Sequence, residues 1–329
     1  MSSNRTLGTL IAAAVAAVVT PPARADFLVS NDGTHSVLRF ADDGTPLGAF
    51  AGGGHLLHPR GLAFGPDGNL FVADPGLGNV ARFDGTTGAF LGTFTQELIS
   101  IPEGLTFGPD GNLYVTSARV GGEGTVLRFD GTTGAPLGVA ASGGGLNRPE
   151  GFAFVSTPFL LVASNGTGEL LDYDSTFGTF VGAVRSGLEG PTGVLADSPF
   201  SVFIAEFDAD RVTHLNGGQI STLSGGGLDG PVGLAFAQDG TLLVASALSN
   251  QVLRYDRTTG AFLGVAASGG GLDQPTYLTS YDFETANPVP APSTRILIVS
   301  GALALLVRAW RMRADTPPGG IHQLRVATA

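Results

Sequence analysis

Short apolar runs recur along the middle of the chain, and turn sequences separate them. In one stretch these runs are 61–64, 70–73, 79–83 and 89–94. The third run alternates polar and apolar residues, as a half-buried strand does. The intervening segments Gly65-Pro66-Asp67-Gly68-Asn69 and Asp84-Gly85-Thr86-Thr87-Gly88 carry the residues that tight turns require. The pattern therefore predicts four short antiparallel β-strands in this stretch.

The same four-strand unit recurs, and each copy opens on a Pro, one variable residue and a short apolar run. The six prolines lie 40 to 47 residues apart and are Pro59, Pro102, Pro149, Pro191, Pro231 and Pro275. A repeat of about forty residues with four strands is typical of a β-propeller blade. The chain is therefore predicted to be all-β, with its repeats arranged in a ring.

The ends of the repeat region complement each other. The segments 27–29, 37–40 and 46–50 match the second, third and fourth strands of a unit, whereas the last repeat supplies a first strand alone, 276–281. We therefore predict a six-bladed β-propeller of four-stranded blades over residues 26–283, whose last blade combines three N-terminal strands with one C-terminal strand. Such closure leaves no exposed sheet edge, whereas an open stack of repeats does not need complementary ends.

Several phrases of the repeat resemble those of a known group of proteins. Pro-x-Gly-Leu-Ala-Phe, Pro-Asp-Gly-Asn-Leu-Phe-Val-Ala-Asp and Val-x-Arg-Phe-Asp are similar to NHL repeats. The same phrasing occurs in the wider six-bladed group of gluconolactonase-like and virginiamycin-B-lyase-like proteins. The resemblance covers about residues 26–283 and implies the fold. It does not specify an activity, because these propellers include enzymes and binding modules.

The N-terminal segment has the features of a secretory signal peptide. An apolar run from Leu7 to Val19 is broken by Pro21 and Pro22, and Ala23-Arg24-Ala25 follows. Signal peptidase recognises such a small-x-small pattern, so residues 1–25 are predicted to be removed. The alternative is a short N-terminal membrane anchor.

The C-terminal segment resembles the PEP-CTERM sorting tail of exported bacterial proteins, which an exosortase cleaves. A linker over 284–295 precedes a hydrophobic helix and arginine cluster over 296–313, and residues 314–329 are predicted to be a disordered tail. The predicted sorting residues are Val289, Pro290, Ala291, Pro292, Ser293, Thr294, Arg308, Arg311 and Arg313. The tail departs from the usual pattern at Ala291, where a glutamate is expected, and by extending beyond the arginines. The alternative is a simple C-terminal transmembrane anchor, oriented by its arginines.

Composition restricts the chemistry and the compartment. The chain has no Cys, which excludes disulfides and thiolate metal sites, and its net charge of −11 argues against binding nucleic acid. Together with the end segments, this predicts export across the inner membrane of a Gram-negative-type bacterium. The protein is then membrane-anchored or held at the cell surface or outside it.

Two sets of equivalent positions are expected to border the central channel. The residues that follow each Pro are Arg60, Glu103, Glu150, Thr192, Val232 and Thr276. The residues that end each second strand are Asn31, Asp74, Ser117, Ser164, Glu206 and Ser246. From these sets we predict a ligand-binding channel mouth made of Arg60, Glu103, Glu150, Asp74, Glu206 and Asn31.

A calcium ion is one hypothesis for this mouth. The gluconolactonase-like resemblance implies a metal held by carboxylates and an amide, and the candidates here are Asp74, Glu103, Glu150 and Glu206. The alternative is that these acids form ordinary ion pairs with Arg60 and other rim residues.

The histidines and the arginines of the third strands are weaker candidates. His35, His55, His58 and His214 show no metal-like spacing, so scattered surface histidines are favoured, although the lyase-like resemblance implies catalytic histidines in inner loops. Equivalent arginines lie in the third strands and are Arg39, Arg82, Arg128 and Arg254. They are expected to pair with neighbouring acids or aromatic rings rather than to form an anion-binding ring.

These observations favour a non-catalytic binding module that recognises a protein or an extracellular polysaccharide. No catalytic residues and no required cofactor are assigned. The competing hypothesis is a metal-dependent enzyme, similar to a lactonase or lyase, acting at the acidic mouth of the channel.

Overall fold

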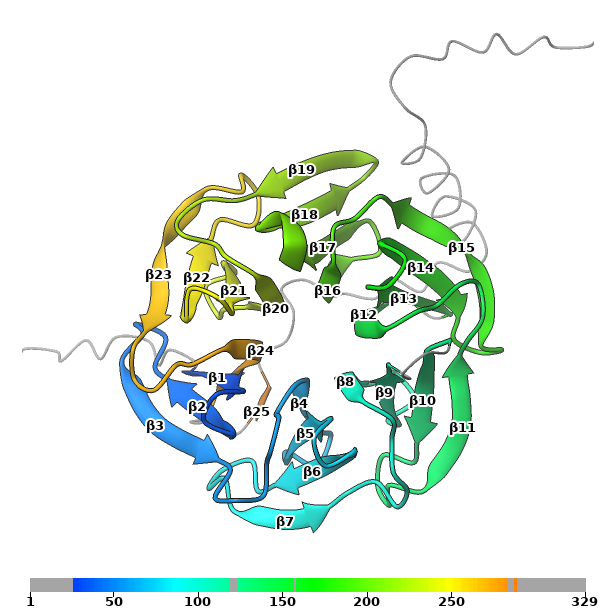
Figure 1. Cartoon of the computed structure of the whole chain (residues 1–329), viewed down its shortest axis with the longest axis horizontal. Helices are drawn as coiled ribbons and strands as arrows, with labels where there is room; N and C mark the ends of the chain where they lie inside the picture. The colour runs from blue at the N-terminus through cyan, green and yellow to red at the C-terminus, as the bar shows by residue number, and fades with distance from the viewer. Residues whose placement is uncertain (1–25, 119–122, 157, 283–286, 289–329) are drawn as a thin grey trace, which may run out of the picture.

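Six antiparallel sheets surround a common centre in the computed structural model, which describes residues 26–118, 123–156, 158–282 and 287–288. The innermost strand of each sheet faces the centre, and the outermost strand forms the perimeter of the ring (Figure 1). The structure therefore confirms the predicted six-bladed β-propeller.

The first three complete blades follow one another along the chain. The first contains β4 (Leu62–Phe64), β5 (Leu70–Asp74), β6 (Asn79–Phe83) and β7 (Phe90–Thr93). The second contains β8 (Pro102–Phe107), β9 (Leu113–Ser117), β10 (Thr125–Phe129) and β11 (Pro136–Ala141). The third contains β12 (Pro149–Ser156), β13 (Phe159–Ser164), β14 (Glu169–Asp174) and β15 (Thr179–Ser186).

Two further blades complete the regular part. The fourth contains β16 (Pro191–Ser198), β17 (Ser201–Glu206), β18 (Arg211–Asn216) and β19 (Gln219–Leu223), with a short 3₁₀ helix, η1 (Phe207–Ala209), after β17. The fifth contains β20 (Pro231–Phe236), β21 (Leu242–Ser246), β22 (Gln251–Tyr255) and β23 (Phe262–Ser268).

The closing blade joins the two ends of the propeller. Its inner strand is β24 (Pro275–Asp282), and β1 (Asp26–Asn31), β2 (Ser36–Phe40) and β3 (Pro46–Ala51) follow outward. β1 and β24 are antiparallel, with Leu28 opposite Thr279. The predicted combination of three N-terminal strands and one C-terminal strand is confirmed. A fifth strand, β25 (Asn287–Pro288), additionally pairs with the end of β24.

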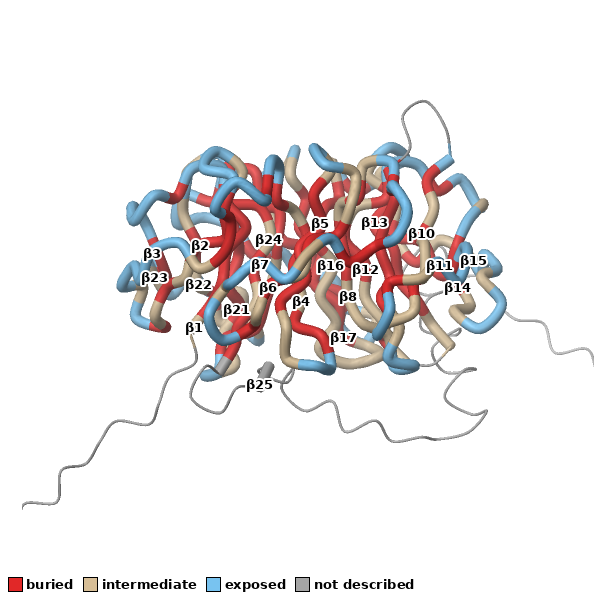
Figure 2. The backbone as a smooth tube through the Cα atoms, turned by 90° about the horizontal axis from the view of Figure 1, so that it is seen from below, coloured by how far each residue is buried: buried red, intermediate tan, exposed pale blue. Residues whose placement is uncertain are grey.

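The core lies between neighbouring blades rather than at the ring centre. Every residue of the second strands β5, β9, β17 and β21 is buried, whereas most residues of outer strands such as β3 and β7 are exposed. One cluster joins Phe71 of the first blade to Leu113 and Phe129 of the second. Figure 2 shows buried backbone within the ring and exposed segments at its edges. Burial of these apolar faces against each other is the main force that holds the blades together.

The turns follow from their side chains. In the turn after β4, the backbone amide of Asn69 donates to Asp67 at 3.0 Å, and Gly68 takes a left-handed φ of 78°. In the turn after β6, Asp84 accepts from the amides of Thr86 and Thr87 at 3.0 and 2.7 Å. These bonds, with one from the Thr87 hydroxyl, lower the pKa of the Asp84 carboxyl. The repeated Asp-Gly and Asp-x-Thr-Thr-Gly phrases thus form local turns that set the strand register.

The predicted signal peptide over 1–25, the sorting helix over 296–313 and the tail over 314–329 lie outside the described residues. Among the residues that are described, no helix combines the length and the apolar character needed to cross a membrane.

Candidate functional site

The residues after the six prolines line one cavity at the centre of the ring, and we call them the mouth ring. The cavity has a volume of about 400 Å³. The mouth ring consists of Arg60, Glu103, Glu150, Thr192, Val232 and Thr276. The other lining residues are Arg148, Asn165, Phe207, Asp208, Ala247, Leu248, Gln274 and Tyr277. The sequence prediction that the variable position faces the channel mouth agrees with this arrangement.

The Gly that five of the six phrases contain explains why the inner strands lie so close together. A Cβ atom on Gly104 would lie 2.5 Å from the carbonyl oxygen of Glu150, and one on Gly193 would lie 2.2 Å from that of Val232. Only Gly permits this approach of neighbouring backbones. The inner strands therefore pack closely around the centre of the ring, and the mouth ring lies at the edge of this inner layer.

Two members of the mouth ring connect blades by hydrogen bonds. The Thr192 hydroxyl donates to the carbonyl of Pro231 at 3.0 Å, and the Thr276 hydroxyl donates to the carbonyl of Pro59 at 3.1 Å. Both side chains are buried. These threonines have a structural role, so the ligand-facing polar groups of the mouth ring are chiefly Arg60, Glu103 and Glu150.

The two glutamates of the mouth ring lie in a poorly hydrated environment. Their side chains are only about 16% and 15% exposed, with Arg60 3.6 Å from Glu103 and Arg148 4.0 Å from Glu150. Burial raises the pKa of Glu103 to about 7, although Arg60 and Arg148 act in the opposite direction. Burial and the neighbouring Glu103 raise the pKa of Glu150 to about 8. Near neutral pH, this pair therefore holds at least one proton that can be donated to a ligand.

Tyr277 also lines the cavity. It occupies the position that is Gly in the other five phrases, and it lines both this cavity and a second one of about 350 Å³. The second cavity is bordered by residues of the inner strands such as Leu105 and Phe152. Burial raises the pKa of Tyr277 well above its usual value, and the charges of Glu150 and Glu103 add to this effect. In the part of the chain that the structure describes, the buried Tyr277 hydroxyl has no hydrogen-bond partner.

The second predicted set lies elsewhere, and we call it the clamp ring. It consists of Asn31, Asp74, Ser117, Ser164, Glu206 and Ser246, all of them buried. Asp74 accepts from the amides of Leu57 and His58 at 2.6 and 3.1 Å, so it holds the loop that precedes Pro59. Glu206 accepts from the amide of Glu189 at 2.8 Å in the equivalent loop.

Other members of the clamp ring hold their own inter-blade loops in the same way. Asn31 donates to the carbonyl of Gly271 at 2.9 Å and accepts from the amide of Asp273 at 2.8 Å. Ser164 accepts from the amide of Asn147 at 3.0 Å. The expectation that Asn31, Asp74 and Glu206 share the mouth with Glu103 and Glu150 is therefore corrected. Their polar atoms satisfy the buried amides of the loops instead.

The four calcium candidates do not form a group of three or more converging ligands among the described residues. Calcium takes six to eight oxygen ligands, most of them charged or strongly polar. The guanidinium groups of Arg60 and Arg148 lie 3.6 Å from Glu103 and 4.0 Å from Glu150 and place positive charge beside these carboxylates. The candidates Asp74 and Glu206 accept hydrogen bonds from loop amides and, for Glu206, from Arg211. A calcium cofactor at this mouth has no support from its geometry.

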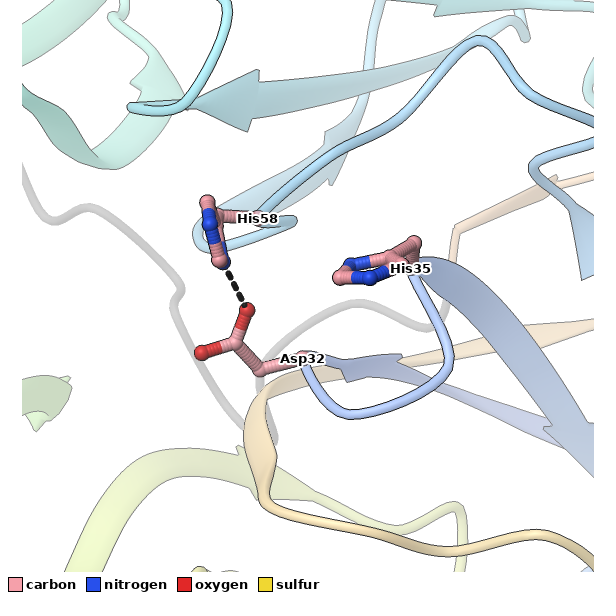
Figure 3. Close-up of side chains that lie close together, drawn as sticks. All are labelled: Asp32, His35 and His58. Carbon is pink, nitrogen blue, oxygen red and sulfur yellow. Dashed lines mark hydrogen bonds and ion pairs between the residues drawn. The ribbon is translucent and has the colours of Figure 1, made fainter.

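The histidines are not simply scattered. His214 is buried, with its ring stacked on Phe203 at 3.9 Å and hydrogen-bonded to Ser201. His35 and His58 lie beside Asp32, and the ligand atoms of these three side chains lie within 4.8 Å of one another (Figure 3). The spacing of the histidines along the chain gave no sign of this group, because the loops that carry them belong to different blades.

The arginines of the third strands pair with acids, as expected. Arg39 contacts Asp26, Arg82 contacts Asp67, and Arg254 contacts both Asp42 and Asp239. Arg128 lies 3.8 Å from Asp110.

Other lining residues were missed by the sequence analysis. Arg148 and Gln274 directly precede a Pro of the repeat phrase, and Asn165, Phe207 and Ala247 directly follow a second strand. These positions recur with the same period as the mouth ring. A comparison of the six copies over their flanking loops would have indicated these lining positions, whereas no single motif indicates them.

The chain resembles solved propellers at low sequence identity. No model of a known protein family matches it, and a search of curated proteins finds no match. It is similar to a chain in the crystal structure of a nidogen/laminin complex, with a TM-score of 0.62, 17% identity, and coverage of 77% of this chain and 97% of that one.

A second similar structure is virginiamycin B lyase from Staphylococcus aureus. Its TM-score is 0.52 at 14% identity, and the match covers 68% of this chain and 76% of that one. Identities this low show a common fold and no shared activity. The resemblance to NHL-type and virginiamycin-B-lyase-like propellers is thus confirmed for the fold.

Proposed function

We propose that this protein is a binding module that recognises part of an extracellular polysaccharide at the mouth ring. The observation that carries the proposal is the cavity of about 400 Å³ at the centre of the ring, whose lining combines hydrogen-bonding and apolar side chains. Arg60, Glu103 and Glu150 supply donors and acceptors for hydroxyl groups. Phe207 and Leu248 supply an apolar surface suited to the face of a sugar ring.

The position of Tyr277 limits how a polysaccharide can enter the cavity. Tyr277 lines both central cavities, and we expect its side chain to prevent a polysaccharide chain from threading the ring. The mouth instead receives one or two units at an end or a bend of the polymer. A protonated carboxyl of Glu103 or Glu150 donates to an ether or hydroxyl oxygen, and the neighbouring arginines favour a ligand that carries a carboxylate.

Binding is tested on immobilised neutral and acidic polysaccharides, with dextran and alginate as the probes. Val232→Trp fills the mouth and is expected to weaken binding at least about tenfold, because it removes the space for a sugar ring. Ile220→Trp on the exposed outer strand β19 is the matched control and leaves binding unchanged. Unchanged binding by Val232→Trp, or retention of a protein segment but of neither polysaccharide, would overturn the proposal.

A second candidate is catalysis at the same mouth, on a lactone or sugar derivative. The specific observation in its favour is the raised pKa of Glu103 and Glu150, since paired carboxyls that titrate near neutrality are suited to acid–base work. Incubating the chain with both probes and following the release of shorter or unsaturated products separates the two candidates. Product formation that Glu150→Gln abolishes favours catalysis.

Export and surface sorting complete the proposal. The segments 1–25 and 289–313 are the proposed substrates of a signal peptidase and of an exosortase-type enzyme, and they carry the sequence features described above. Deleting residues 289–329 should release the protein into the medium. Cell association that persists in this variant contradicts the sorting role.

A further inference from the structure

Three side chains converge where the closing blade meets the first blade. Asp32 and His35 lie in the loop between β1 and β2, and His58 lies in the loop between β3 and β4. The Nδ1 atom of His58 is 2.8 Å from Oδ1 of Asp32, and the rings of His35 and His58 are 5.6 Å apart, edge to face. In Figure 3 both imidazole rings border the space beside the Asp32 carboxylate. The group lies outside the mouth cavity, because none of its members is among the lining residues.

The loop that carries His35 is well defined. The amide of Asp32 donates to the carbonyl of Gln274 at 3.2 Å, and the amide of His35 donates to the carbonyl of Asp32 at 3.2 Å. His35 has a left-handed φ of 53°. The equivalent left-handed positions in other blades are Gly78, Gly168, Asp210 and Asn250. The closing blade thus places an imidazole ring at a position that these four blades give to Gly, Asp or Asn, the residues that tolerate a left-handed φ best.

The chemistry of the group matches a particular class of ion. Two imidazole nitrogens and one carboxylate oxygen suit zinc and neighbouring divalent transition metals, whereas calcium prefers oxygen ligands alone. Neighbouring ligand atoms of a tetrahedral zinc ion lie about 3.3 Å apart. The existing separations, from 2.8 Å to within 4.8 Å, bracket that value. If the ion replaces the proton shared by His58 and Asp32, the ligand atoms need to move by about 1–2 Å to reach the spacing of a tetrahedral zinc site.

We propose that Asp32, His35 and His58 bind one divalent transition-metal ion of the zinc class, with water as the fourth ligand. His58 is about 48% exposed, so the open coordination position faces solvent. Because the ligands come from two blades, the ion fastens the closing blade to the first blade. Arg60 lies 3.2 Å from Oδ2 of Asp32, the carboxylate oxygen that His58 does not contact, and helps to orient this carboxylate.

The test uses the full chain after removal of metals with a chelator. Titration with Zn²⁺ by calorimetry is expected to show one tight equivalent. Titration with Co²⁺ is expected to give the visible absorption of a tetrahedral site. At about a hundredfold excess of Zn²⁺ over its Kd, the thermal midpoint is expected to rise by about 5 °C, because the ion binds the folded ring alone.

Single variants define the ligands. His35→Gln and His58→Gln should each weaken Zn²⁺ binding at least about a hundredfold, since loss of even an outer-shell partner costs roughly 10- to 100-fold. His55→Gln is the matched control, because His55 lies in the same loop as His58 with its ring stacked on Phe90. It should retain the tight equivalent and the rise in the thermal midpoint.

Three results would overturn the proposal. They are the absence of a tight equivalent in the wild-type chain, an equal loss of affinity in His55→Gln and His58→Gln, and a Zn²⁺ affinity that no loop variant changes. Tight binding of Ca²⁺ with none of Zn²⁺ would likewise contradict the assigned ligand chemistry.

Discussion

Glu150 of the mouth ring and Glu206 of the clamp ring are both shielded from water, yet their acidities move in opposite directions. Burial dominates at Glu150 and raises its pKa, because the nearest cation, Arg148, is 4.0 Å away. Burial also acts to raise the pKa of Glu206, but hydrogen bonds from Arg211, Thr213 and the amide of Glu189 outweigh it, and the net pKa is lowered.

The comparison teaches that position within a repeat does not fix the role of a side chain. Each of the two glutamates occupies a position that recurs once in every blade. What separates them is the number of donors within reach, which is high where the inter-blade loop folds over the side chain and low at the open cavity. A carboxylate with several donors becomes a structural element, whereas one with few donors keeps its capacity to interact with a ligand.

The largest effect is expected from Glu206→Ala. The substitution leaves Arg211 and the Glu189 amide without their partner, so we expect the free energy of unfolding to fall by about 3–5 kcal/mol. Urea unfolding at pH 7 measures it. Glu150→Ala is the matched variant and should cost less than about 1 kcal/mol. Equal losses in the two variants would remove the distinction between the rings.

The next effect is a dependence of stability on pH. The pKa values of Glu103 and Glu150 rise from 4.5 to about 7 and about 8 on folding, so their contribution is fully present below pH 4.5 and is lost as the pH rises through 7–8. The wild type should therefore lose more stability between pH 5 and pH 9 than the Glu103→Gln/Glu150→Gln double variant, which chemical unfolding at the two pH values measures. Parallel stability curves for the two proteins would contradict the raised values.

The contribution of Glu206 to the pH dependence of stability has the opposite sign. Its pKa is lowered on folding, so its contribution is present above the ordinary glutamate pKa and is lost as the pH falls through the folded value. The Glu206→Ala variant should therefore lose less stability than the wild type on acidification below pH 4.5. Chemical unfolding at pH 3 and pH 7 compares the two proteins.

A smaller effect is expected at the neutral members of the clamp ring. Ser164→Ala removes the acceptor of the Asn147 amide and should cost about 1–2 kcal/mol. The control is Ser186→Ala, which removes an exposed hydrogen bond to Glu169 and should change stability by less than about 0.5 kcal/mol. Thermal unfolding of both variants shows whether serine acts as a clamp as the larger residues do.

The smallest effect concerns Tyr277, which lines the mouth cavity. Tyr277→Phe removes a buried hydroxyl that has no partner among the described residues, so stability should stay within about 0.5 kcal/mol of the wild type or rise. A loss above about 1 kcal/mol would show that the hydroxyl is hydrogen-bonded to solvent in the ring.

The repeat phrases were sufficient to predict the architecture. The period of the prolines, the Asp-Gly turns and the complementary end strands predicted the blades and their closure, because each of these signals is local and recurs. The mouth ring was predicted for the same reason: in five of the six phrases the residue after the Pro is followed by a Gly that packs against the next blade.

The clamp ring and the histidine group could not be assigned from the sequence. Whether Asp74 faces the channel or the loop depends on where the amides of Leu57 and His58 lie, and these are set by the path of the loop. The contact between His58 and Asp32 joins residues 26 apart in sequence across a blade boundary. The sequence indicated which side chains could bind protons, metals or ligands, but it did not indicate where the loops place them.

Because β1 pairs with β24, the ring closes only when the chain includes its C-terminal strand. Asn31 is held by the Asp273 amide, 242 residues further along the chain, so the seam forms after nearly the whole described region has been synthesised. Until then β1 has an unpaired edge, on which proteases and aggregation act most readily. A chain cut short before Pro275 lacks the strand that covers this edge, so truncated copies are expected to be degraded or to aggregate more readily than the complete chain.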